Sequence, residues 1–230
     1  MLDYNGLLEL VQARRSIRKF KPEAVPDSVI NQVLEMARWA PSGANSQPWE
    51  FIVVKDKAVK DKVVAIAREA VHFVQKLEVT RDKEAQHPNA HRRLADIGFK
   101  DAPVLIAIIG DRRARQAQVL AAQLGPQSYL AGLAYAELYM HLAATTLGLG
   151  SQWLTSPSDP SYQALIKDVL KIPRYFNLFD IFVLGYPAES PGPRTVRKLE
   201  EMVHTDHYDI TRGRKDAEVK QFARKIQLEQ

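Results

Sequence analysis

The sequence predicts an α/β or α+β protein built as one domain around one sheet. Segments with helical periodicity alternate with apolar runs that are rich in β-branched and aromatic residues. The chain has 230 residues, of which 46% are hydrophobic and 26% charged, and this balance is typical of a soluble globular protein with a sizeable core. No internal repeat and no Gly/Ser linker divides it.

Four apolar runs predict the strands of the sheet. They are rich in β-branched and aromatic residues, and three of them are long enough to be buried strands. The runs are WEFIVVKD (49–56), APVLIAIIGD (102–111), the short SQWLT (151–155) and FDIFVLGYP (179–187).

Helices are expected before, between and after these runs. The second one should start at Asp27 or Ser28 as N-cap and stop at Pro41. The fourth is rich in Ala and Gly, which allow close approach of neighbouring backbones, so we expect it to be the central core helix. The expected ranges are 4–14, 28–40, 56–75, 129–150, 162–170 and a terminal helix within 211–230.

Composition excludes several classes of protein. Without cysteine, the chain cannot form disulfides, thiolate zinc sites or a cysteine nucleophile. The N-terminus does not have the pattern of a signal peptide, and no apolar run reaches the roughly 18 residues of a membrane span. A cytoplasmic protein without membrane contact is therefore expected. The net charge of +5 is compatible with nucleic acid, an anionic cofactor or simple solubility.

The segment RRSIRKF (14–20) concentrates four cations around one serine. An arginine pair can donate planar, bidentate hydrogen bonds to a phosphate, and a serine hydroxyl adds one donor. A solvated charged turn between two helices explains the composition equally well. A second cationic run follows the last predicted strand, at Arg194, Arg197 and Lys198, and spacing alone does not show whether the two runs meet.

The loop PSGANSQP (41–48) offers short neutral donors and acceptors between two prolines. Gly43 permits close backbone approach, so the loop suits a ligand with many hydroxyl groups or a heteroaromatic ring. An ordinary helix–strand connection would account for the composition but not for the two bracketing prolines.

Other motifs in the sequence do not indicate a function. Gly148-x-Gly150 follows a helix instead of a strand, so a helix C-cap is the better interpretation than a dinucleotide fingerprint. The pairs His87/His91 and His204/His207 lack a completing ligand, and neither a G-x-S-x-G elbow nor a triad is found. Metal binding and hydrolysis are not predicted.

Four motifs in one order carry a family resemblance. RRSIRKF, APSGANSQPWEFIVV, AATTLGLGSQWL and LGYPAESPGPRTVRKLEEMVH resemble the nitroreductase family of FMN-dependent oxidoreductases, from about Gly6 to His204. The resemblance implies an α+β fold, a mixed central sheet flanked by helices, and an intertwined homodimer with FMN at the interface. It implies a nitroreductase-like domain over 1–205, with a substrate lid at 70–100. The excess of cations near the C-terminus predicts a basic, partner-facing arm over 206–230.

The resemblance also assigns residues to FMN, with one subunit supplying the cationic segment and its partner the polar loop. Arg14, Arg15 and Ser16 would hold the phosphate, and Arg18 would face the N1–C2=O edge of the ring, where a cation favours the reduced, anionic flavin. Arg194 and Arg197, one or both, would close the phosphate site. Further contacts are implied for Pro41, Ser42, Gly43, Asn45, Gln47, Leu154 and Thr155.

The implied activity needs no catalytic side chain. NADH or NADPH would give hydride to flavin N5, and an organic acceptor such as a nitroaromatic or quinone would then take its place on the same face. A reductive dehalogenase is the alternative within the family, although no tyrosine occurs between Tyr4 and Tyr129 to match the lid of iodotyrosine deiodinases. The loop also differs from the glycine–aromatic variant of the cobalamin lower-ligand synthases.

Two alternatives belong to other classes. A flavin-binding sensor or carrier would keep the FMN site without turnover. A basic nucleic-acid-binding protein would use the cationic segment and the C-terminal arm, but the cationic runs lack interleaved aromatics and no helix-turn-helix pattern is found.

Overall fold

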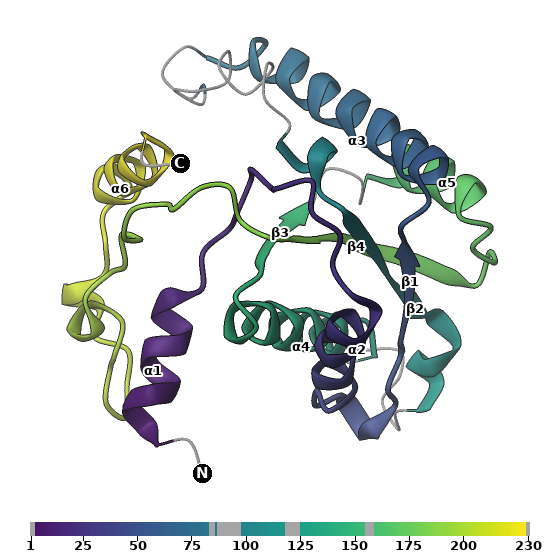
Figure 1. The fold of residues 1–230 in the computed structure, drawn as a ribbon. Helices are drawn as coiled ribbons and strands as arrows, with labels where there is room; N and C mark the ends of the chain where they lie inside the picture. Colours follow the sequence, from purple (N-terminus) through teal and green to yellow (C-terminus); the bar gives the residue numbers. More distant parts are fainter. Residues whose placement is uncertain (1–2, 83–85, 87–97, 118–124, 155–158, 229–230) are drawn as a thin grey trace. The chain divides into compact units, whose positions relative to one another are not determined.

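A computed structural model places four strands in one sheet; it describes residues 3–82, 86, 98–117, 125–154 and 159–228. The strands are β1 (Trp49–Val54), β2 (Val104–Asp111), β3 (Gly150–Leu154) and β4 (Phe176–Gly185). Each one falls on an apolar run that predicted a strand. Their order is β1-β2-β4-β3, and all three pairings are antiparallel (Figure 1). The parallel contact of the described sheet is an isolated bridge between Ser16 and Ser151, on the outer edge of β3.

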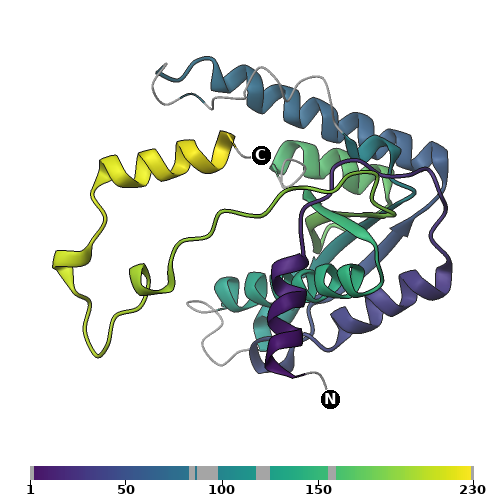
Figure 2. The same ribbon diagram turned by 60° about the vertical axis from the view of Figure 1, so that its left-hand side comes forward.

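Helices cover both faces of the sheet. α2 (Asp27–Arg38) and α4 (Gly125–Thr146) lie on one face, while α5 (Pro160–Val169) and the first part of α3 (Lys57–Glu78) lie on the other (Figures 1 and 2). The central strands β2 and β4 therefore bury side chains on both faces, and two apolar clusters result. The α+β class and the flanking helices are confirmed, whereas the implied mixed sheet is not, because the pairings between the described strands are all antiparallel.

A bulge decides which face one acidic residue of β4 occupies. The register between β2 and β4 shifts at Ile108/Ile109, so that Ile108 pairs with Asp180 and Ile109 with Leu178. Ile108 belongs to the apolar cluster under α4, whereas Ile109 and Leu178 belong to the cluster under α3. Asp180 thus lies on the α4 face of the sheet.

Two glycines follow the central helix α4, and each is needed for a different structural reason. Gly148 has φ +71, and Leu149 N–H donates to Ala144 O at 2.8 Å, as in a glycine C-cap. Gly150 is required for space, because a Cβ there would lie 2.8 Å from the Ile17 side chain. The C-cap interpretation is confirmed for Gly148, and Gly150 instead allows the N-terminal segment to approach β3.

The described chain divides into two compact units. One comprises Met1–Val71 and Ile97–Pro191, with the sheet and its helices; the other comprises His72–Asp96 and Gly192–Gln230. The first begins with α1 (Tyr4–Ala13), capped by the Asp3 carboxylate, which accepts from Gly6 N–H at 2.8 Å. The second contains α6 (Asp216–Leu228), reached through an extended segment with two short turns (Figure 2).

The start of α2 differs from the prediction. Its N-cap is Pro26, with no side-chain cap hydrogen bond, instead of Asp27 or Ser28. Asp27 is the first helical residue, where its carboxylate still favours the positive end of the helix dipole, and it accepts from Lys55 Nζ at 2.6 Å. Among the described residues, no helix is both long and apolar enough to cross a membrane.

Candidate functional site

The cationic segment Arg14–Phe20 is an extended chain fixed to the edge of the sheet. Ile17 N–H donates to Ser151 O at 2.9 Å, and Ala188 N–H donates to Lys19 O at 2.9 Å. The two apolar members, Ile17 and Phe20, are both buried and anchor the segment. The interpretation as a solvated turn is therefore wrong, because the backbone is bonded on both sides and only some of the side chains face solvent.

Glu189 supplies negative charge to this segment. Its carboxylate accepts the backbone N–H of Arg18 and also that of Lys19, the latter at 3.1 Å. Two charge-assisted bonds at one carboxylate fix the backbone at the centre of the cationic cluster. Sequence reasoning missed Glu189; the available signal was one acid in the Pro-rich run directly after a buried strand.

The polar side chains of the segment differ in exposure. Arg14, Arg15, Ser16 and Arg18 are half-buried, whereas Lys19 is exposed. Arg14 also ends α1, since its N–H donates to Leu10 O at 3.1 Å. The arginines are thus held at a backbone of defined conformation, which favours bidentate recognition of an anion.

The polar loop that follows α2 is tightly folded and strained. Ala44, Asn45 and Gln47 all have positive φ, between 42° and 53°, although none is glycine. The Ser42 hydroxyl accepts from Gln47 N–H at 2.9 Å, and Gln47 Nε2 donates to Asn45 Oδ1 at 3.3 Å. Non-glycine residues in this conformation are concentrated at functional sites, so the strain supports a binding role.

The loop and the cationic segment contact opposite parts of α4. Gly132 lies under the loop, since a Cβ there would lie 3.2 Å from Ser42 Cβ. The cationic segment reaches α4 through Ser151, whose hydroxyl lies 2.7 Å from His141 Nδ1. Nine residues of helix separate these contacts, about 14 Å along the axis. One chain therefore does not gather both predicted parts of the site at one point.

The end of β3 is held by a buried acid. Leu154 is buried, and its N–H donates to Asp180 Oδ1 at 3.2 Å. Ile181 N–H donates to the same oxygen at 2.6 Å. Thr155 lies outside the described residues. Glu137, His141 and Asp180 are buried on the α4 face, and sequence reasoning assigned no role to any of the three.

Arg194 and Arg197 belong to the second unit. The Arg197 guanidinium donates to Glu201 O at 2.8 Å and to the Glu201 carboxylate at 3.4 Å. Arg194 is exposed. His204, weighed earlier as a metal ligand, accepts from Asp209 N–H at 3.1 Å and packs against Tyr208, while His87 and His91 lie outside the described residues.

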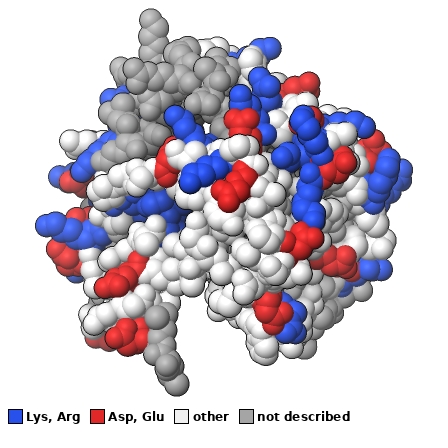
Figure 3. Space-filling model, in the orientation of Figure 1, with Lys and Arg blue, Asp and Glu red and all other residues white. Residues whose placement is uncertain are grey.

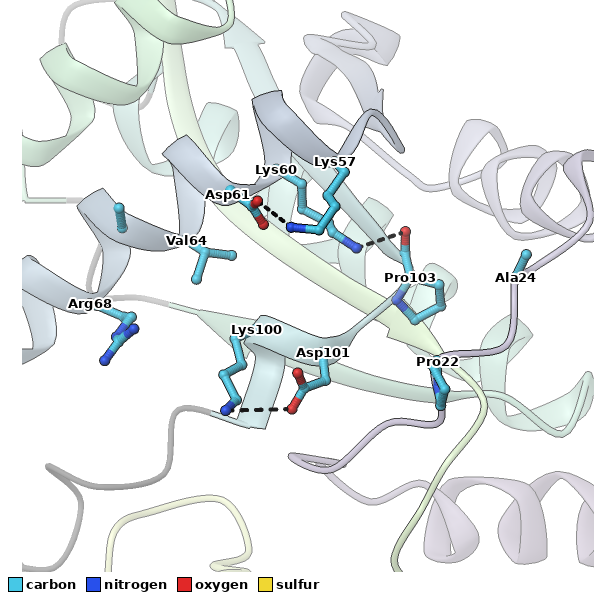
Figure 4. Close-up of a pocket in the computed structure, with 11 residues that line it drawn as sticks. Pro22, Ala24, Lys57, Lys60, Asp61, Val64, Arg68, Lys100, Asp101 and Pro103 are labelled. Carbon is cyan, nitrogen blue, oxygen red and sulfur yellow. Dashed lines mark hydrogen bonds and ion pairs between the residues drawn. The ribbon is translucent and has the colours of Figure 1, made fainter.

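A separate cationic pocket of about 660 Å³ lies between α3, the short turn Gly98–Asp101 and residues 22–24 (Figure 4). Its cations are largely matched by acceptors of the chain. Lys57 pairs with Asp61 at 2.5 Å, and Lys60 Nζ donates to Ala102 O at 2.6 Å, with burial lowering the pKa of Lys60. None of the predicted site residues lines this pocket, and we assign it no ligand.

Fold and site together define an α+β protein whose sheet edge presents an ordered, arginine-rich segment. The chain matches the model of the "Nitroreductase family" over residues 11–186 and belongs to this family, as the resemblance implied. A relative described as a putative NADH dehydrogenase/NAD(P)H nitroreductase, from Methanothermobacter thermautotrophicus, is 30% identical over 82% of this chain and 81% of its own.

Two iodotyrosine deiodinases are also similar. The one from Danio rerio is 27% identical over 87% of this chain and 64% of its own length. A crystal structure of oxidized iodotyrosine deiodinase bound to FMN and 3-iodo-L-tyrosine superimposes with a TM-score of 0.72, at 24% identity, over 88% of this chain and all of the other. At that identity the likeness establishes the fold alone.

Proposed function

We propose that the protein is an FMN-dependent oxidoreductase that passes hydride from NADH or NADPH, through flavin N5, to an organic acceptor such as a nitroaromatic or quinone. The observation that carries this proposal is the fixed backbone of the cationic segment. Backbone bonds from Ile17 to Ser151 and from Arg18 and Lys19 to Glu189 fix the segment at the sheet edge before an anion binds, and Arg15, Ser16 and Arg18 are half-buried there.

The residues fit FMN by their chemistry. Arg14, Arg15 and Ser16 would bind the phosphate, and Arg18 would lie near the N1–C2=O edge of the ring. When bound, FMN supplies the redox chemistry and the protein binds, orients and tunes it. Leu154 would pack against the ring, and the same role for Thr155 stays a prediction. That Arg194 and Arg197, one or both, close the phosphate site stays a prediction.

We propose further that the active form is a homodimer in which the partner supplies the polar loop. The separation of about 14 Å along α4 between the loop and the cationic segment supports this arrangement. So does exposed apolar surface in the first unit. α1 buries none of its residues, and α4 exposes Leu130, Tyr135 and Leu138 by 45–48%. A second copy of the chain would cover both helices.

Reductive dehalogenation is the second candidate within the family. The similarity to the two deiodinases favours it. Their lid would correspond to the proposed lid at 70–100, of which residues 70–78 continue α3 and most of the rest lies outside the described residues. The substrate therefore has to be found by a panel that includes halogenated phenols as well as nitroaromatics and quinones, each with NADH and NADPH.

The proposals from other classes have less support. On the face drawn in Figure 3, acidic and basic side chains are intermixed and form no continuous cationic surface of the kind that binds nucleic acid. A flavin sensor or carrier would bind FMN but fail every turnover assay. The basic arm over 206–230, a domain boundary at 205 and a cytoplasmic location stay predictions.

The test compares Arg18→Ala with Lys19→Ala, because the neighbouring Lys19 is exposed and has no assigned role. Purified protein should be yellow, because bound flavin absorbs at about 450 nm. We expect Arg18→Ala to slow flavin reduction about 10-fold or more while FMN affinity changes much less, since the cation acts on charge that develops in the ring. Lys19→Ala should match the wild type. A colourless protein that binds no added FMN would contradict the proposed function.

A further inference from the structure

A cluster of polar side chains is buried directly behind the proposed FMN site. Glu137 and His141 lie one turn apart on the inner side of α4, Ser151 lies on β3, and Asp180 lies on β4. All four are at most 7% exposed. His141 also packs its ring against Phe182, with ring centres 4.7 Å apart. Burying polar groups costs free energy, so we expect these side chains to have a role that offsets this cost.

This cluster contacts both FMN-binding segments of the first unit. Ser151 connects the cluster to the cationic segment: its hydroxyl lies 2.7 Å from His141 Nδ1, and its carbonyl accepts Ile17 N–H at 2.9 Å. Asp180 connects the cluster to the end of β3, where its carboxyl oxygen accepts Leu154 N–H at 3.2 Å. The backbones of residues 16–17 and 154 are thus held from behind by one buried group of side chains.

Burial shifts the titratable members of the cluster toward their neutral forms. Burial raises the pKa of Glu137 to about 8, and burial followed by the nearby Glu137 raises the pKa of Asp180 well above its ordinary value. Burial, and next the charge of Arg14, lowers the pKa of His141 to about 3. The 3.8 Å contact between His141 Nε2 and Glu137 Oε1 is therefore not an ion pair at pH 7.

The neighbouring elements add few further charges. Arg14 faces His141 from the end of α1, and Arg15 follows it at half-burial. Among the side chains that the structure describes, the other acidic and basic groups on the elements packed around α4 are exposed or engaged at the surface. They are Asp3 and Glu9 on or beside α1, Asp27, Glu35 and Arg38 on α2, Glu50 on β1, Asp111 on β2, and Arg112 and Arg113 in the turn after β2.

We propose that Glu137, His141, Ser151 and Asp180 form a positioning cluster, which holds both FMN-binding segments in place and makes FMN affinity depend on the protonation of its carboxyl groups. The proposal rests on the proposed FMN site. While the carboxyl groups keep their protons, no negative charge lies behind the arginines. Loss of a proton would place a carboxylate in the low-dielectric core beside them and oppose the phosphate from behind.

Thermodynamic linkage requires FMN binding to affect the protonation of the cluster in return. If ionisation of the cluster weakens FMN binding, bound FMN must raise the pKa of the cluster, and binding must take up protons where the free protein is partly ionised. Proton uptake is a readout that a merely structural role would not give.

The test measures the FMN dissociation constant of the full chain between pH 7 and pH 9, by quenching of flavin fluorescence. Wild type should lose about 5-fold in affinity over this range, which is the loss expected when a pKa of about 8 in the free protein rises by about one unit on binding. Glu137→Gln, which copies the neutral acid, should lose less than about 2-fold. Glu69→Gln, at an exposed position on α3, should behave as wild type and controls for removal of one acid.

Calorimetry in buffers of different ionisation enthalpy then counts protons at pH 8. Uptake by wild type and Glu69→Gln but not by Glu137→Gln supports the proposal. Equal pH dependence in all three proteins overturns it. A folding defect in Glu137→Gln is checked by thermal unfolding, and Asp180→Asn, which should also flatten the pH profile, is then measured in its place.

Ser151→Ala tests the positioning half separately. It removes the hydroxyl that meets His141 but leaves both carboxyl groups, so affinity should fall at every pH while the slope with pH stays. Affinity equal to wild type at all pH values would overturn the positioning role. If no variant and no wild type binds FMN at any pH, the proposed function itself has failed, and this outcome is distinct from FMN binding without pH dependence.

Discussion

The two faces of the sheet pack apolar layers of similar kind but differ in what else they bury. Under α3 and α5 the described core is built from residues such as Leu105 and Ile166, without a buried ionisable group. Under α2 and α4 the core includes comparable residues together with Glu137, His141 and Asp180. Since such groups cost stability when buried, folding alone accounts for the apolar α3 face, whereas the polar groups of the α4 face fit the positioning role that we propose for them.

The largest expected effect tests whether the apolar layers are equivalent. Leu105→Ala on the α3 face and Leu133→Ala on the α4 face should each lower the free energy of unfolding by about 2–5 kcal/mol, because each leaves a cavity in a close-packed core. Both side chains are at most 1% exposed. Urea denaturation measures the loss. A loss below about 1 kcal/mol on one face only would show that the two layers are not comparable.

A second prediction isolates the buried acid. Because the pKa of Glu137 in the folded protein, about 8, exceeds its ordinary value, its contribution to stability is complete at low pH and is lost as pH rises toward 8. Between pH 6.5 and pH 8, Glu137→Gln should therefore gain about 2 kcal/mol relative to wild type, at about 1.4 kcal/mol per pH unit. Urea titrations at both pH values give the difference. Parallel curves would contradict the raised pKa.

On the acidic side the expected sign is opposite. The pKa of His141, about 3, lies below its ordinary value, so the stability that depends on neutral His141 is present above pH 6.5 and is lost as pH falls toward 3. Glu137→Gln leaves this loss in place.

A third prediction concerns the edge where the α4 face meets the cationic segment. Glu189→Gln keeps an acceptor but removes its charge, and it should cost about 1.5 kcal/mol because hydrogen bonds to charged groups are the stronger ones. Limited trypsin cleavage should then occur sooner after Arg18 or Lys19. Glu201→Gln removes the exposed partner of Arg197 and serves as control. Equal cleavage of both variants would remove the assigned role of Glu189.

The smallest effect concerns the turn that connects α4 to β3. Gly148→Ala should cost about 1 kcal/mol, because φ +71 is unfavourable for a residue with a Cβ while no atom lies within 4 Å of that Cβ. Gly192→Ala has equal space without the positive φ and should be neutral. Thermal unfolding compares the two variants. Similar melting temperatures would show that the positive φ of Gly148 does not require a glycine.

Periodicity and composition predicted every strand and nearly every helix end within a few residues, because the pattern of burial is written locally along the chain. The N-cap of α2 was predicted wrongly, since Pro26 and not a side-chain cap starts that helix. The motif order predicted the family. Glu189, Asp180 and the bulge that turns Asp180 toward α4 were not predicted, because each acts on residues far away in the chain.

The sequence by itself determined the elements, the family and the arginine-rich segment, since residue types and spacing suffice for these. Only the tertiary structure decided what that segment is. Glu189 offsets part of its charge, the edge of β3 fixes its shape, and a buried cluster whose members are 4 to 43 positions apart supports it. Such partners meet through strand order and register, which no local pattern records.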